Sequence, residues 1–217
     1  MLGTQDLALF VVSGLLLNAV PGPDTLLVMS RGAAHGFRIG SAAALGVGAG
    51  VFIHVLAAAL GLSALLATSA AAFTVVKWVG AAYLVFLGLQ MLLVRGLKPG
   101  PEGRHVQDAE MIVAAATWRQ VFIQGLVTNV LNPKVALFFL AFVPQFISAD
   151  ASSTAMAFIF LGCLFNVNSI AWSHLLAWVA AEGGRRLRLP ARTLRWLNRG
   201  IGVLFVGFGL RLLLSHR

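Results

Sequence analysis

Six apolar stretches, each near the length of a membrane-spanning helix, constrain this chain more than any other feature. A helix needs about 20 mostly apolar residues to cross the hydrocarbon core of a bilayer. The stretches cover residues 6–30, 39–66, 73–94, 120–143, 153–181 and 200–214. We therefore predict an all-α integral membrane protein with six transmembrane helices.

The composition agrees with a membrane environment. Of the residues, 59% are hydrophobic and 11% are charged, whereas soluble domains carry about 25% charged residues. Because no second region has a soluble composition, we expect one transmembrane domain over residues 1–217. The net charge of +9 does not indicate nucleic acid, since the basic residues lie in short connectors, where they orient the chain and meet anionic lipid headgroups.

The connectors alternate in charge. Lys and Arg gather in the first, third and fifth connectors, whereas the second, over residues 67–72, has no charge and the fourth carries only Asp150. Positive connectors stay in the cytoplasm. This bias predicts that both termini lie outside the cytoplasm, which would be the periplasm for a protein of a bacterial inner membrane.

The two halves of the chain resemble each other. The segment Gly14 to Asn18 matches Gly125 to Asn129, and the same offset brings Pro21-Gly22-Pro23 opposite Asn132-Pro133-Lys134. We predict a first repeat over about residues 1–97, a cytoplasmic loop over about 98–117 and a second repeat over about 118–217. Each repeat holds three helices, so the second must be inverted. Inverted repeats interrupted at matching places are typical of a transporter binding site.

The prolines predict that the first and fourth helices are broken. Proline in a helix interior removes a hydrogen bond and clashes with the preceding turn. In hydrocarbon, the freed backbone groups need a partner or a water-filled cavity. Pro21, Gly22 and Pro23 therefore open the first helix, and Asn132 and Pro133 the fourth. The freed groups are candidates to bind substrate, although a packing kink would also explain them.

Each break is followed by a charged residue. Ionisable residues inside a membrane are rare and usually functional. A zwitterion offers an ammonium to Asp24 and a carboxylate to Lys134. Asp24 is also a candidate proton carrier, because burial favours the neutral form of a carboxyl group. Two other interpretations stay open: a static ion pair, or placement of both residues at the cytoplasmic interface.

Four further polar residues are candidates. Asn18 and Asn129 precede the breaks by about one turn, where they either satisfy freed backbone groups or bind substrate. His54 and His174, in the second and fifth stretches, are candidates for proton coupling, or they are hydrogen-bonded packing residues. Glycines in the second stretch have spacings that suit close helix packing, within the chain or in a homodimer.

Three segments resemble a known family. Residues 18–28 (NAVPGPDTLLV) resemble the N-terminal signature of the LysE/RhtB amino-acid exporters, residues 124–146 (QGLVTNVLNPKVALFFLAFVPQF) its second signature, and residues 80–88 (GAAYLVFLG) its third-helix pattern. The resemblance covers essentially the whole chain. It implies efflux of an amino acid such as threonine, homoserine, homoserine lactone, leucine or lysine, driven by the proton gradient.

We therefore expect a transporter and not an enzyme, with an amino acid, protons and membrane lipids as partners and with no cofactor or resident metal. A membrane thiol–disulfide enzyme would need two cysteines, and the sequence has only Cys163. A metal-ion exporter would favour clustered Cys and His ligands. A lipid-handling or structural membrane protein would not need paired breaks beside opposite charges.

Overall fold

The structure is a computed structural model that describes residues 3–62, 117–148 and 150–183, with isolated positions between 74 and 92 and between 199 and 210. The described residues form six α-helices with short π and 3₁₀ segments, and they contain no strand. The prediction of an all-α fold is confirmed to that extent. Apart from helical single positions, the stretches 73–94 and 200–214 lie outside the described residues, as does the loop 98–117 up to Thr117.

Two helices are bent at the predicted prolines. Helix α1 spans Leu7–Ala19 and α2 spans Pro23–His35, with a bend of 60° between them. Helix α7 spans Trp118–Val130 and meets, at 48°, a second segment made of α8, a π turn and a 3₁₀ turn. The bounds of these three pieces are Pro133–Leu137 (α8), Phe138–Phe142 (η2) and Val143–Phe146 (η3).

Two long helices are unbroken. Helix α3 spans Phe37–Ala57 and continues as the π segment η1, Ala58–Leu62, whereas α9 spans Thr154–Gly183. By length and composition, these two helices can each cross a membrane, and the described residues contain four spans if each bent pair counts as one. The first, second, fourth and fifth predicted stretches thus correspond to helices. The start of α7, two residues early, is set by a capping box between Thr117 and Gln120.

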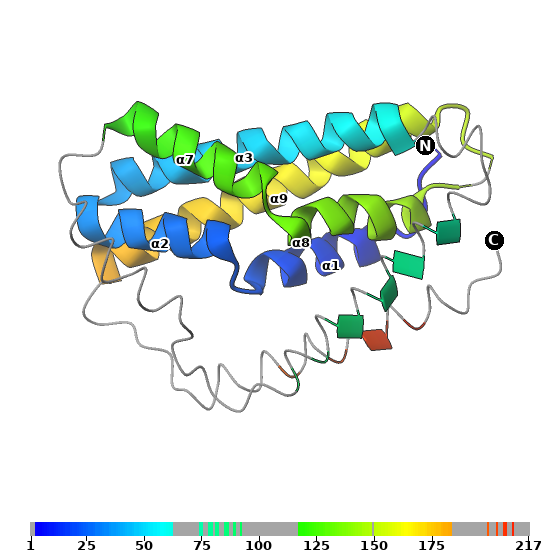
Figure 1. The fold of residues 1–217 in the computed structure, drawn as a ribbon, viewed down its shortest axis with the longest axis horizontal. Coiled ribbons are helices and arrows are strands. Elements are labelled where there is room, and N and C mark those ends of the chain that lie inside the picture. The colour runs from blue at the N-terminus through cyan, green and yellow to red at the C-terminus, as the bar shows by residue number, and fades with distance from the viewer. Residues whose placement is uncertain are drawn as a thin grey trace.

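The half-helices divide the molecule along its length. Helices α3 and α9 run the full length, α2 and α7 lie along one half, and α1 and α8 lie along the other (Figure 1). The end of α2, the start of α7 and the end of α9 gather at one end of the bundle. Both breaks therefore lie near the middle of the bundle.

Hydrogen bonds join the segment before α1 to the end of η3 and the residues after it, at the far end of the bundle. Gln5 donates its backbone N–H to the carbonyl of Phe146 over 2.9 Å, and Ser148 donates to the carbonyl of Gly3 over 2.8 Å. Next to these two hydrogen bonds, Phe10 packs against Phe146 with ring centroids 5.2 Å apart. A buried aromatic cluster continues inward to the break.

Small residues let α3 approach α7 closely. A side chain at Gly46 would collide with the backbone of Phe122, and one at Gly125 with the backbone of Ala43. The glycines that the sequence singled out in α3 therefore pack helices of the same chain, as small residues commonly do in membrane bundles. This close contact between α3 and α7 sets the position of the second break, which follows the end of α7, relative to α3.

Candidate functional site

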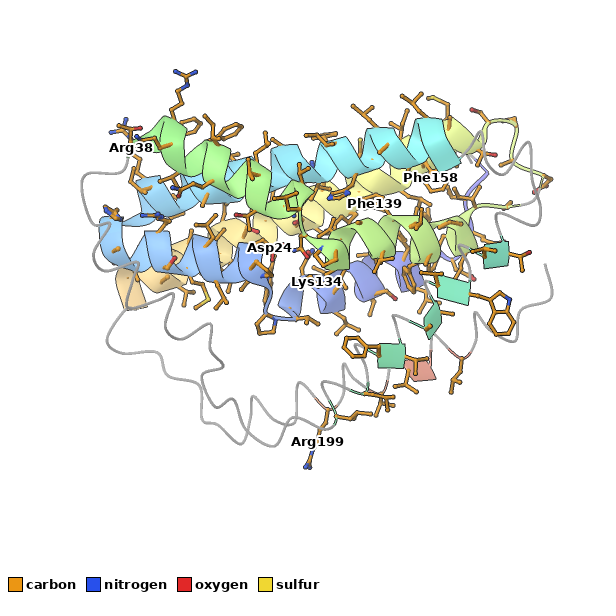
Figure 2. All side chains as sticks on the ribbon, in the orientation of Figure 1. Asp24, Arg38, Lys134, Phe139, Phe158 and Arg199 are labelled. Carbon is orange, nitrogen blue, oxygen red and sulfur yellow. The ribbon has the colours of Figure 1, made fainter. Side chains whose placement is uncertain are left out.

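The two helix breaks meet. Asp24, in the first turn of α2, and Lys134, in the first turn of α8, lie next to each other at the centre of the bundle (Figure 2). A Cβ atom on Gly22 would stand 2.8 Å from Asp24 Oδ1 and 3.1 Å from Lys134 Nζ. The opposite charges therefore flank one glycine, which has no side chain to separate them.

Lys134 satisfies the carbonyls that the first break frees. The carbonyl of Leu17 would normally accept from the N–H of residue 21, but Pro21 has none, and it accepts from the N–H of Val20 over 3.2 Å instead. Lys134 Nζ donates to the carbonyl of Leu17 over 3.3 Å and to that of Val20 over 3.0 Å. An ammonium at a helix C-terminus is also favoured by the helix dipole. This accounts for how Lys134, with only 8% of its surface exposed, is accommodated in the interior.

A histidine contacts a carbonyl at the second break in the same manner. The carbonyl of Asn129 would accept from the N–H of residue 133, which is again a proline. It accepts from the N–H of Asn132 over 2.9 Å, and His54 Nε2 lies 3.0 Å from the same oxygen. A carbonyl only accepts, so Nε2 carries the proton. The ring of His54 stacks on Phe139, with centroids 6.3 Å apart.

Asn129 also links this break to Asp24. Its Nδ2 donates to Asp24 Oδ2 over 3.5 Å, which is a long hydrogen bond. Asp24 Oδ1 accepts from the backbone N–H of Thr25 over 3.0 Å. His54 and Asp24 are therefore connected through the backbone carbonyl and the side-chain amide of one residue.

Several buried amide atoms at the breaks have no hydrogen-bond partner among the described residues. They are Asn18 Nδ2, Asn129 Oδ1 and Asn132 Nδ2. The other end of Asn132 caps α8, since its Oδ1 accepts from the Lys134 backbone N–H over 3.0 Å. Buried polar groups are nearly always hydrogen-bonded, so such atoms usually mark a bound water or ligand.

The structure separates the two candidate histidines. His174 Nε2 lies 2.8 Å from Ser41 Oγ, and its Nδ1 donates to the carbonyl of Ile170 over 2.8 Å. Ser41 and His54 both belong to α3, where they lie about 20 Å apart along the helix axis. The breaks thus bring together Asp24, Lys134, Asn129, Asn132 and His54, but not His174.

Sequence reasoning did not select Asn166 as a site residue. Asn166 on α9 is 2% exposed, its Oδ1 has no hydrogen-bond partner in the part of the chain that the structure describes, and a Cβ atom on Gly48 of α3 would stand 3.4 Å from that oxygen. Gly48 is only two residues from Gly50, against which Asn129 packs. Asn166 therefore lies at the level of the breaks. The sequence offers one signal for this residue, an asparagine within an apolar helix. The spacing of its neighbours did not predict which way the Asn166 side chain points.

A model of the LysE type translocators matches residues 15–216 of the chain. The chain belongs to the LysE type translocator family. It is 32% identical to a leucine efflux protein from Enterobacter sp. (strain 638) over 99% of this chain and 98% of that protein. A leucine efflux protein from Klebsiella pneumoniae is 30% identical, with 97% and 95% of the two chains covered.

Other translocator relatives carry no functional name. An uncharacterized membrane protein from Pseudomonas aeruginosa is 31% identical over 97% of this chain and 96% of that protein. No solved structure matches the translocator. Membership in a translocator family identifies a membrane transporter rather than an enzyme, and it confirms the family expected from residues 18–28 and 124–146.

Proposed function

We propose that the translocator exports amino acids or their close derivatives from the bacterial cytoplasm and that protons drive the export. One observation carries the proposal: two broken helices meet where Asp24 and Lys134 flank Gly22. Discontinuous helices at the middle of the membrane are the usual site of small-substrate binding in secondary transporters.

The charges of this site complement both ends of a zwitterion. The substrate ammonium would pair with the carboxylate of Asp24. The substrate carboxylate would pair with the ammonium of Lys134 and with the positive end of the α2 dipole. The amide atoms of Asn18, Asn129 and Asn132 that have no partner among the described residues supply further hydrogen bonds. Gly22 places no side chain between the two charges.

We assign proton coupling to Asp24 and His54, which both contact Asn129. Asp24 would exchange a proton for the substrate ammonium, because its carboxylate lies at the break, where the substrate ammonium would bind. His54, which reaches Asn129 from α3, is the second candidate. His174 remains a third candidate, placed about 20 Å along α3 from His54.

The names of two relatives suggest which substrates to test first. Both the Enterobacter and the Klebsiella relatives are named leucine efflux proteins. We propose that this translocator takes a neutral amino acid of the leucine or threonine class. The aromatic cluster that begins one turn after Lys134, with Phe138 and Phe139, offers an apolar environment next to the ionic site.

The proposed orientation follows the basic connectors. Arg31 lies near the end of α2, and Arg38 and Arg119 lie in the first turns of α3 and α7. These helix ends gather at the end of the bundle where α9 finishes (Figure 1). We propose that this end faces the cytoplasm. Export then carries substrate from the end occupied by α2 and α7 toward the end occupied by α1 and α8.

Transport by the purified protein in sealed vesicles tests this function. Labelled leucine, threonine, homoserine and lysine would be measured with and without an imposed pH gradient. We expect gradient-dependent movement of one class, reduced to background in Asp24→Asn and Lys134→Gln. Asp150→Asn and Arg38→Gln are the matched controls, because each removes one exposed charge of the same sign away from the site.

Two results would contradict the proposal in different ways. Transport that survives both site substitutions would mean that the two charges are structural. Folded wild-type protein that moves none of the amino acids, with or without a gradient, would remove amino-acid export itself. A divalent metal ion, carried in the same vesicles, would then be the next substrate to test.

A further inference from the structure

One face of α9 carries polar residues where a membrane helix would ordinarily be apolar. Asn166, Ser169 and Ser173 are 2%, 5% and 9% exposed, and their spacing of three and four residues places them on a single face. The same face continues into Ala177, which is fully buried. Polar residues that face the interior of a membrane bundle commonly mark a substrate pathway.

The face of α9 is covered by α2. A Cβ atom on Gly32 would stand 2.8 Å from the carbonyl oxygen of Ala177, so the two helices touch there through backbone. Helices α2 and α9 run in the same direction (Figure 1). About two turns back from this contact, α2 reaches Asp24 and α9 reaches Ser169. The polar face therefore runs from the contact at Ala177 to the level of Asp24.

Helix α2 meets this face at a glycine. Gly32 lies against the Ala177 carbonyl, and Gly40 of α3 packs on both residues, since a Cβ on Gly40 would stand 2.9 Å from Gly32 Cα and 3.0 Å from Ala177 Cβ. Helix α2 is also bounded by two points at which the chain can turn: the break at residues 20–22, and Gly36 with φ of 81°. A short helix with a turn at each end can swing away from α9 without unfolding either helix.

Asn166 gives a second, independent observation. Its Oδ1 is buried without a partner among the described residues and lies next to Gly48 of α3, at the inner end of the polar face. Trp172 Nε1 and Asn168 Nδ2, on the same helix, are likewise buried without partners. Serine hydroxyls can bond the carbonyls of their own helix, but a carboxamide oxygen cannot, because a carbonyl is not a donor. A state in which water or substrate reaches Asn166 would satisfy it.

We propose that the seam between α2 and α9 is the cytoplasmic access route of the translocator, with Asn166 as a further substrate-contacting residue at its inner end. In this structure the route is closed where Gly32 of α2 lies against Ala177 of α9. It opens when α2 swings away and exposes Ser173 and Ser169 to water. The direction of the route rests on the proposed export function, whereas its existence as a water path does not.

Cysteine accessibility tests the route directly, because the chain has a single native cysteine. In a Cys163→Ala background, Ser169→Cys and Ser173→Cys would be treated with a membrane-impermeant methanethiosulfonate in inverted vesicles. The matched controls are Val167→Cys and Leu175→Cys, whose native side chains are 64% and 47% exposed on the outer face of the same helix. Because thiolates form only where water reaches them, we expect the serine positions to react at least about ten times faster than the controls.

A variant with a larger side chain at the contact between α2 and α9 tests whether α2 moves. Gly32→Val places side-chain atoms against the Ala177 carbonyl and should hold α2 away from α9, which raises labelling at Ser173→Cys and lowers transport. Gly14→Val is the control, because it wedges α1 against Phe165 of the same helix instead. We expect Gly14→Val to leave the labelling at that position unchanged.

The outcomes distinguish this inference from the proposed function. If both serine positions react no faster than the controls, in protein that still transports, the route is refuted while export stands, and the serines are packing residues. If the serine positions react and substrate protects them, but Asn166→Ala transports and binds as the wild type does, the role of Asn166 is refuted. If labelling is fast but no amino acid moves or protects, the route stands and the proposed function fails.

Discussion

Gly50→Ala is the substitution for which the structure gives the sharpest expectation. The new methyl group would stand 2.8 Å from Asn129 Cβ and 3.0 Å from the carbonyl oxygen of Leu126. Carbon atoms prefer separations of about 3.5–4.0 Å, so Asn129 must move by about 1 Å. The hydrogen bond from Asn129 Nδ2 to Asp24 is already 3.5 Å long and would be lost.

The effect on stability should be small compared with the effect on transport. Overpacking costs about 1–3 kcal/mol, and replacement of a helical glycine by alanine returns roughly 0.5–1 kcal/mol, which leaves a net loss of about 1 kcal/mol. A misplacement of about 1 Å in a binding site can slow a reaction by roughly a hundredfold. We expect a comparable fall in the initial efflux rate, with a thermal unfolding midpoint lowered by only a few degrees.

The assay compares initial efflux rates in vesicles with thermal unfolding of the same preparations in detergent. Gly61→Ala is the matched control, because a Cβ atom at Gly61 meets nothing within 4 Å. If Gly50→Ala transports at the wild-type rate, the position of Asn129 relative to Asp24 does not limit transport. If it unfolds during purification, the contact between α3 and α7 is more rigid than this reasoning assumes.

Three further substitutions test ionisable side chains, two of them at the breaks. Lys134→Met should lower the unfolding midpoint, since the Val20 carbonyl loses the Lys134 donor at about 1–3 kcal/mol and the Leu17 carbonyl keeps only the N–H of Val20. Adding Pro21→Ala should restore part of the loss by supplying an N–H. His54→Ala should lower the free energy of unfolding by about 0.5–1.5 kcal/mol in the native background. The loss should be smaller in a Pro133→Ala background, where residue 133 has an N–H, and a double-mutant cycle measures this difference. His174→Gln should slow efflux less than His54→Gln, and the reverse order would move proton coupling away from the breaks.

The sequence was sufficient to predict the helices and the places where they break. Long apolar stretches can satisfy their backbone only as helices in a bilayer, and proline interrupts a helix wherever it lies in the interior. For this reason the bends at Pro21–Pro23 and at Asn132–Pro133 could be predicted without tertiary information. The predicted three-helix repeats remain a prediction, because the third and sixth stretches lie outside the described residues.

The partners of the freed groups could not be predicted. The sequence suggested a pairing between Asp24 and Lys134, but it gave no reason to expect that the ammonium would bond the carbonyls of Leu17 and Val20. Those contacts depend on how the end of α1 meets the start of α8, which is set by long-range packing. The same holds for Asn166, whose direction depends on the rotation of α9 about its own axis.

The same physical requirement explains the composition of the site. Each proline leaves one carbonyl without its usual donor, and in the membrane interior such a group is costly unless another donor replaces it. At each break a nearby backbone N–H and a side chain from a different helix share this role: Val20 and Lys134 of α8 for Leu17 in α1, and Asn132 and His54 of α3 for Asn129 in α7. Both side-chain donors can move, and both are ionisable. Under the proposed function, a substrate ammonium or a water that competes for these carbonyls would release an ionisable side chain at the same time. Substrate binding and the rearrangement of charge would then be linked at the breaks.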